Sequence, residues 1–160
     1  MICSMPEIDA LIANTRRSLI RLQAVSGRLD ERALVEVTIS GWTIAGTLAH
    51  LAFFDDWVAE RWRRRLASGA FQDLPDDITD LVNAAGGRAW QAIASDQATA
   101  IATGAAEAVV SLLETLSRAA LDDAIATRRP AMIDRSLHWE PHLDQIEDAL
   151  RWERPRPNSR

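Results

Sequence analysis

The chain has 160 residues, a formal net charge of −5 and 48% hydrophobic residues, enough for one domain with a substantial core. An acidic chain without a block of basic residues is not expected to bind nucleic acid. A single cysteine, Cys3, excludes an intrachain disulfide and fits a reducing compartment. With no apolar run of membrane-spanning length and no signal-peptide pattern at the N-terminus, the sequence predicts a cytoplasmic protein outside the membrane.

The alanine-rich composition, with few glycines and prolines, favours helices over sheets. The first helix is expected to begin at Ser4, which forms a capping box with Glu7, and to end at about residue 28. Residues 33–41 mix β-branched and polar types; as a single strand without a partner, they are expected to form an extended connection.

The second long helix is expected from near Thr43 to about Ser68. Ser40 or Thr43 can cap its first turn, and Gly69 can close its end in the left-handed conformation. His50 lies on a wide arc of this helix that the pattern predicts to be buried, on the same face as Phe54 and Trp57.

A shorter helix is expected from residues 76–77 to about 93, with a bend or break at Gly86 and Gly87 because each costs about 1 kcal/mol relative to alanine. The next helix begins at the cap formed by Ser95 and Asp96. Its apolar stripe continues through Ala120, so we expect one continuous helix up to the loop at 128–130.

The last helix is expected to begin between Asp134 and His138. Pro141 would cost about 3 kcal/mol in the helix interior, which favours a start near His138. Residues 154–160 are expected to form a disordered tail. The sequence therefore predicts an all-α domain over residues 1–153, with four long helices and one additional short helix.

His138 and His142 are two of only three histidines in the chain, and they are four residues apart. On a helix this spacing puts both imidazoles on one face, as two metal ligands on one helix require. If His50 joins them, three imidazoles form an open metal site, in which a coordination position remains for water or substrate.

The segment from Gly41 to Ala52 resembles the second-helix signature of the DinB-like superfamily, which includes the metal-binding domain of mycothiol-dependent maleylpyruvate isomerases. The residues that carry the resemblance are Trp42, Thr43, His50, Leu51 and Trp57, followed in the last helix by His138, His142 and Leu143. It covers most of the chain in the order and length of its helices, although Gly86 and Gly87 are atypical.

The resemblance implies a four-helix bundle with up-up-down-down connections, often a homodimer. It implies a divalent metal, zinc or nickel, held by His50, His138 and His142. It further implies a transferase or isomerase that acts on a small-molecule substrate and uses mycothiol, bacillithiol or glutathione, because thiol activation as thiolate is chemistry that a metal supports.

Other side chains are candidates for contacts around this site. Trp57 and Arg61 share the face of His50, and Arg61 could reach an anionic substrate. Trp139 is either a core residue or faces the substrate, and Glu140, like Glu147, could accept a hydrogen bond from an imidazole. Asp56 is a further candidate for such a bond.

Two alternatives to the thiol-using enzyme remain open from the sequence. The same metal site could serve a hydrolase that uses metal-bound water. The fold could also be a non-catalytic module for ligand binding or dimerisation. No side chain stands out as a general base, and the chain has no Ser-His-Asp pattern, phosphate loop or GxGxxG motif.

Overall fold

The computed structural model describes residues 5–152, all of whose regular structure is helical. The elements are α1 (Met5–Ser26), α2 (Glu31–Leu34), α3 (Ile44–Ser68), α4 (Ile78–Gln91), α5 (Ser95–Thr115), α6 (Arg118–Ala126), the 3-10 helix η1 (Pro130–Met132) and α7 (Ser136–Trp152). The predicted all-α fold is confirmed. The cap at Ser4, Cys3 and the expected tail at 154–160 lie outside the described residues.

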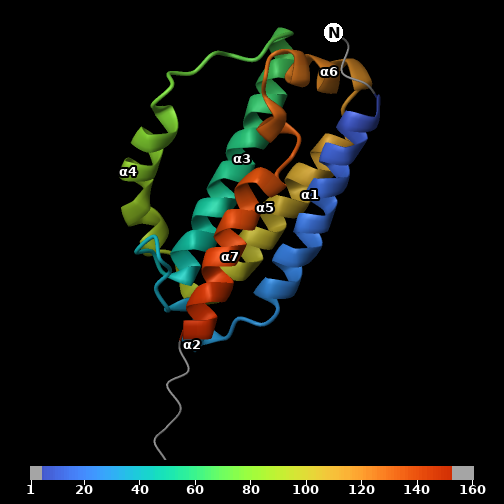
Figure 1. Cartoon of the computed structure of the whole chain (residues 1–160). Helices are drawn as coiled ribbons and strands as arrows, with labels where there is room; N and C mark the ends of the chain where they lie inside the picture. Colours follow the sequence, from blue (N-terminus) through green and yellow to red (C-terminus); the bar gives the residue numbers. More distant parts are fainter. Residues whose placement is uncertain (1–4, 153–160) are drawn as a thin grey trace, which may run out of the picture.

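The four long helices α1, α3, α5 and α7 form a bundle in which α1 and α7 run in one direction and α3 and α5 in the other (Figure 1). The expected up-up-down-down order is therefore wrong, and the order along the chain is up-down-down-up. Side-chain hydrogen bonds follow this order. The segment formed by η1 and α7 bonds to α1 through Asn14–Asp134 and Arg21–Glu147, and to α3 through Asp55–Trp139 and Trp62–Met132. Helices α1 and α5 bond through Arg16–Glu114 and Gln23–Glu107.

Helices α3 and α5 can run in the same direction because of α4, which lies outside the bundle next to α3 (Figure 1). Together with the loop that precedes it, α4 carries the chain back along the length of α3, so that α5 starts at the same end as α3. An up-up-down-down order would place this long connection between α1 and α3 instead. That connection is short and holds only α2 and an isolated bridge between Val37 and Thr43.

Helix α4 continues through Gly86 and Gly87, so the expected break there does not occur. At Gly86, a Cβ atom would lie 2.6 Å from Cζ2 of Trp90, and at Gly87 it would lie 3.6 Å from the indole of Trp42. The absence of a side chain at Gly86 makes room for the indole of Trp90, whereas at Gly87 a Cβ would make an ordinary van der Waals contact. The intrinsic cost of Gly86 is thus offset by the packing of Trp90 against His50 and Phe54 of α3.

Helix α5 ends at Thr115, and α6 follows at an angle of 107°, which contradicts the expected continuous helix. Leu116 is extended, and the side chain of Ser117 accepts a hydrogen bond from the backbone N–H of Ala120, which starts the new helix. Within the described residues no single helix is long and apolar enough to cross a membrane. Among residues 5–152, the bent pair α5 and α6 together meets the length and composition required.

Both ends of α3 are formed as expected. The side chain of Thr43 accepts from the N–H of Gly46, and Gly69 is left-handed with φ 86°. At α7, the helix begins at Ser136, earlier than the start near His138 that Pro141 favours, and Pro141 lies inside the helix. Pro141 is on the exposed side of α7, where water can replace its missing donor.

The core lies between the four long helices. Its largest fully buried side chains are Trp62, Trp139, Ile8, Leu22, Ile44 and Leu48. Trp139 is therefore a core residue and does not face a substrate pocket. Each such side chain contributes about 1.5–3 kcal/mol by leaving water, so their burial stabilises the packing of α1, α3 and α7.

Candidate metal centre

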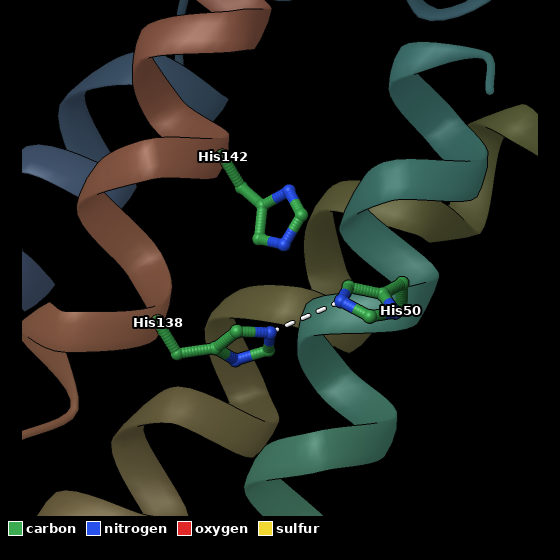
Figure 2. Close-up of side chains that lie close together, drawn as sticks. All are labelled: His50, His138 and His142. Carbon is green, nitrogen blue, oxygen red and sulfur yellow. Dashed lines mark hydrogen bonds between the residues drawn. The ribbon is translucent and has the colours of Figure 1, made fainter. Parts of the chain in front are cut away.

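Three histidines from two helices meet in the bundle (Figure 2). His50 comes from α3, whereas His138 and His142 lie one turn apart on α7. The Nε2 atoms of His50 and His138 are 3.0 Å apart. One ring nitrogen from each of the three histidines can be chosen so that all lie within 4.8 Å of one another. The residues that the sequence singled out are therefore brought together.

Local sequence explains how each imidazole reaches this point. The cap at Thr43 sets the start of α3, and His50 follows within its second turn on the face that α7 covers. The spacing of four residues stacks His138 and His142 on one face of α7. Because α3 and α7 are antiparallel, the N-terminal part of each helix lies within reach of the middle of the other.

Burial keeps the three imidazoles neutral. His50 is only 3% exposed. Burial, together with the neighbouring His142, lowers the pKa of His50 to about 3. Burial first, and then the charge of Arg135, lowers the pKa of His138 to about 2. Burial also lowers the pKa of His142, although a hydrogen bond with Gln145 acts in the opposite direction. Neutral imidazoles have the lone pair that a metal ligand needs.

An aromatic wall covers the side of the cluster formed by α3 and α4. The ring of His50 lies 5.0 Å from Trp42, 4.8 Å from Trp90 and 4.9 Å from Phe54, measured between centroids. Phe54 also contacts the ring of His138 at 5.3 Å. This wall shields one side of the cluster from water, and the position of Trp90 in it depends on Gly86 of α4.

Sequence reasoning missed two charged residues next to the histidines. Asp55 is fully buried, and Arg135, which is 3% exposed, donates from Nε to Oδ1 of Asp55 at 2.9 Å. Burial raises the pKa of Asp55 to about 6, although Arg135 and Trp139 act to lower it. The signal for Asp55 was in the sequence, because it interrupts the buried apolar stripe that runs from Leu48 to Trp62. The adjacent Asp56, which sequence reasoning preferred, is exposed.

The donor set fits a divalent transition metal. Nitrogen ligands bind zinc at about 2.0–2.1 Å, which places two ligands of a tetrahedral site about 3.3 Å apart. The separation of 3.0 Å between Nε2 of His50 and Nε2 of His138 is close to that value, and the limit of 4.8 Å for the three rings means that a small side-chain shift would close the set around an ion. Three imidazoles suit zinc or nickel, and such a set leaves at least one coordination position for another ligand.

A cleft of about 700 Å³ adjoins the cluster. Phe54 and Arg135, which line this cleft, also contact His138. Trp57 and Arg61 line it as well, which places both of these sequence candidates beside the site. Arg61 donates to the backbone oxygen of Gln72 at 3.2 Å, and burial lowers its pKa.

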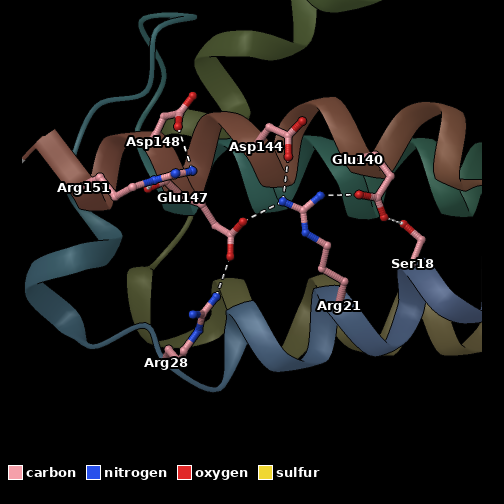
Figure 3. Close-up of polar contacts among 8 residues, drawn as sticks. All are labelled: Ser18, Arg21, Arg28, Glu140, Asp144, Glu147, Asp148 and Arg151. Carbon is pink, nitrogen blue, oxygen red and sulfur yellow. Dashed lines mark hydrogen bonds and ion pairs between the residues drawn. The ribbon is translucent and has the colours of Figure 1, made fainter.

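Glu140 and Glu147 bond to residues of α1 and of the turn that follows it (Figure 3), so the expectation that they bond an imidazole is wrong. Glu140 accepts hydrogen bonds from Ser18 and Arg21 of α1. Glu147 accepts from Arg21 at 2.6 Å and from Arg28 at 2.7 Å. The physical reason is helical geometry, because both glutamates lie on the face of α7 that packs against α1.

The fold and the histidine cluster define the class of this protein as a DinB-like helical bundle with a possible metal site. Comparison with family models gives the particular family. Residues 10–146 match the model of the mycothiol maleylpyruvate isomerase N-terminal domain, and the chain belongs to this family. Comparisons with curated proteins and with solved structures gave no match.

Proposed function

We propose that the protein is a metal-dependent transferase or isomerase that uses a low-molecular-weight thiol. The observation that carries the proposal is the convergence of three neutral imidazoles from α3 and α7, of which His50 is buried and His138 and His142 are partly buried. In the proposal, His50, His138 and His142 hold the cation, with zinc or nickel as the metal. When bound, such a cation would favour the thiolate form of a thiol, which is its nucleophilic form.

The thiol and the substrate class are proposed from the family. Its name specifies mycothiol and maleylpyruvate, so mycothiol is the first thiol to test. Maleylpyruvate is an organic acid, and Arg61 lies half-buried in the cleft without an ion-pair partner among the described residues. We propose that Arg61 binds the acidic group of the substrate and that Trp57 packs against its apolar part.

Metal content tests the first part of the proposal. The protein, purified without a histidine tag, is expected to contain zinc or nickel by elemental mass spectrometry. After treatment with a chelator, adding metal at about 100 times its Kd should stabilise the fold by about 2.7 kcal/mol. A folded protein that contains no metal and is not stabilised by zinc or nickel would contradict both enzyme readings and favour a non-catalytic module.

Thiol binding separates the transferase or isomerase from a metal-dependent hydrolase. Isothermal titration of the metal-loaded protein with mycothiol is compared with titration by its S-methyl derivative. The derivative keeps the shape of mycothiol but cannot form a thiolate. Tight, metal-dependent binding of mycothiol alone is expected. Equal binding of both compounds, or of neither, would argue against thiol activation and favour the hydrolase or the module.

The role of Arg61 is tested with fumarate as a simple organic dianion. Its binding should weaken in Arg61→Met and remain unchanged in Arg64→Met, because Arg64 is exposed and pairs with Glu60. Equal effects of the two substitutions would contradict the proposed role. The homodimer is likewise a proposal, supported by the resemblance, and light scattering after gel filtration tests it.

A further inference from the structure

A buried polar network lies next to the three histidines. Asp55 accepts a hydrogen bond from Nε of Arg135 at 2.9 Å and bonds from Nε1 of Trp139 at 3.0 Å to both of its oxygens. All three side chains are at most 4% exposed. A buried ion pair is rarely the most stable choice for a core, because desolvating two charges is costly. The network therefore calls for a role other than stability.

Arg135 is held in one position by contacts on several sides. Its backbone N–H donates to Oγ1 of Thr15 at 2.9 Å, and its Nη1 donates to the backbone oxygen of Ala131 at 3.0 Å. Its Nη2 lies 3.2 Å from Nδ1 of His138. A guanidinium has only donors, so in this contact Arg135 donates and Nδ1 of His138 accepts.

This contact determines where the proton of His138 lies. A neutral imidazole carries one N–H, so if Nδ1 accepts, the proton is on Nε2. Nε2 of His138 is 3.0 Å from Nε2 of His50 and can donate to it (Figure 2). The proton of His50 is then on its Nδ1, a buried atom without a hydrogen-bond partner in the described part of the chain. The contacts from Arg135 to His50 are thus satisfied by a single assignment of N–H positions on the two imidazoles.

We propose that Arg135 and Asp55 are positioning residues for the histidine cluster. Asp55 holds Arg135, and Arg135 holds Nδ1 of His138, so that Nε2 of this ring is directed at His50 and one tautomer predominates. Arg135 lies between the cluster and the carboxylate, whereas a metal-binding histidine ordinarily donates directly to a carboxylate or carbonyl. This inference goes beyond the proposed enzyme, because it concerns the metal-free protein. A metal held by Nε2 of His138 would have to replace the proton on that atom.

Long-range proton–nitrogen NMR correlation on the metal-free protein at neutral pH tests the inference, since it distinguishes protonated from unprotonated ring nitrogens. Single histidine-to-alanine variants assign the three imidazoles. We expect a His138 ring with unprotonated Nδ1 and protonated Nε2. Removal of the arginine should abolish this single tautomer.

Arg135→Met alone would leave the charge of Asp55 buried and could prevent folding. The double variant Asp55→Asn/Arg135→Met removes both charges and keeps an acceptor for Trp139. In this variant we expect His138 to lose its single tautomer. The matched control is Trp62→Phe, which removes another buried hydrogen bond of α3, to Met132, and should keep the wild-type pattern.

Two results would overturn the inference: a protonated Nδ1 on His138 in the wild type, or the wild-type pattern in the double variant. Both are independent of the metal proposal. A protein that binds no zinc or nickel but shows the expected tautomer would contradict only the proposed function. A metal-binding protein without this tautomer would contradict only the positioning role.

Discussion

The Nε2 atoms of His50 and His138 lie 3.0 Å apart, although 88 positions separate the two residues in the chain. The contact depends on the antiparallel packing of α3 and α7, and His142 joins it from the next turn of α7. Any change that shifts one of these helices along the other therefore alters the cluster, and substitutions at a distance should affect it in a predictable way.

Replacing any one of the three histidines should strongly reduce metal affinity. His50→Ala, His138→Ala and His142→Ala each remove one of three proposed ligands. The loss of metal affinity should exceed the roughly 10–100-fold loss that follows removal of a residue that hydrogen-bonds a ligand. Gln145→Ala, which removes only the partner of His142, is the graded control. Competition titrations with a chromogenic chelator measure the affinities, and full affinity in any histidine variant would exclude that residue as a ligand.

The metal-free protein should lose stability as the pH falls. Because the pKa values of His50 and His138 are lowered in the folded state, to about 3 and about 2, the unfolded chain takes up protons first. Stability should decrease below pH of about 6.5, by up to about 1.4 kcal/mol per pH unit for each such histidine. Below pH of about 6 the raised pKa of Asp55 offsets part of this loss, because the folded state then takes up a proton there. Urea unfolding in a chelator at pH 7, 6 and 5 measures this slope. His50→Gln should have a smaller slope, and an unchanged slope would contradict the prediction.

The buried ion pair predicts a strong asymmetry between single and double substitutions. Asp55→Asn leaves the charge of Arg135 buried without its partner and should cost about 3–5 kcal/mol. Asp55→Asn/Arg135→Met removes both charges and should be more stable than the single variant. The free energies of unfolding of the single and the double variant, measured in urea, test this order of stability. A double variant less stable than Asp55→Asn would show that the pair itself is strongly stabilising.

Gly86→Ala should perturb the aromatic wall. Alanine favours a helix over glycine by about 1 kcal/mol, but here its Cβ would lie 2.6 Å from Trp90, which contacts His50. We expect altered tryptophan fluorescence and no gain in stability. The control is Gly104→Ala in α5, where a Cβ meets nothing within 4 Å, so the full gain is expected. Equal gains at the two sites would show that the indole moves aside without cost.

Arg21 should contribute to the seam between α1 and α7 without affecting the metal site. It binds Glu140, Asp144 and Glu147 at once and is partly buried. Arg21→Met should cost about 1 kcal/mol, less at high salt, as expected for a network of partly exposed charges. Arg16→Met, which breaks a single exposed pair with Glu114, should cost less. Metal affinity should not change in either variant, because the seam lies on the face of α7 away from the histidines.

The sequence by itself determined the helices that have local signals. The cap at Thr43, the left-handed Gly69 and the spacing of His138 and His142 depend only on neighbours within one or two turns, so α3 and the pair on α7 could be predicted. The family resemblance added His50 to this pair. Both inferences depend on short-range patterns, and the structure brings the three residues together.

Only the tertiary structure decided the direction of the helices and the surroundings of the histidines. The continuity of α4 at Gly86 depends on Trp90 packing into the space of a missing side chain, which helix propensity does not contain. Likewise, Arg135 becomes the partner of Asp55, and Glu140 that of Arg21, through contacts between segments far apart in the chain. Such contacts depend on which faces meet, and this is fixed by packing of the whole bundle.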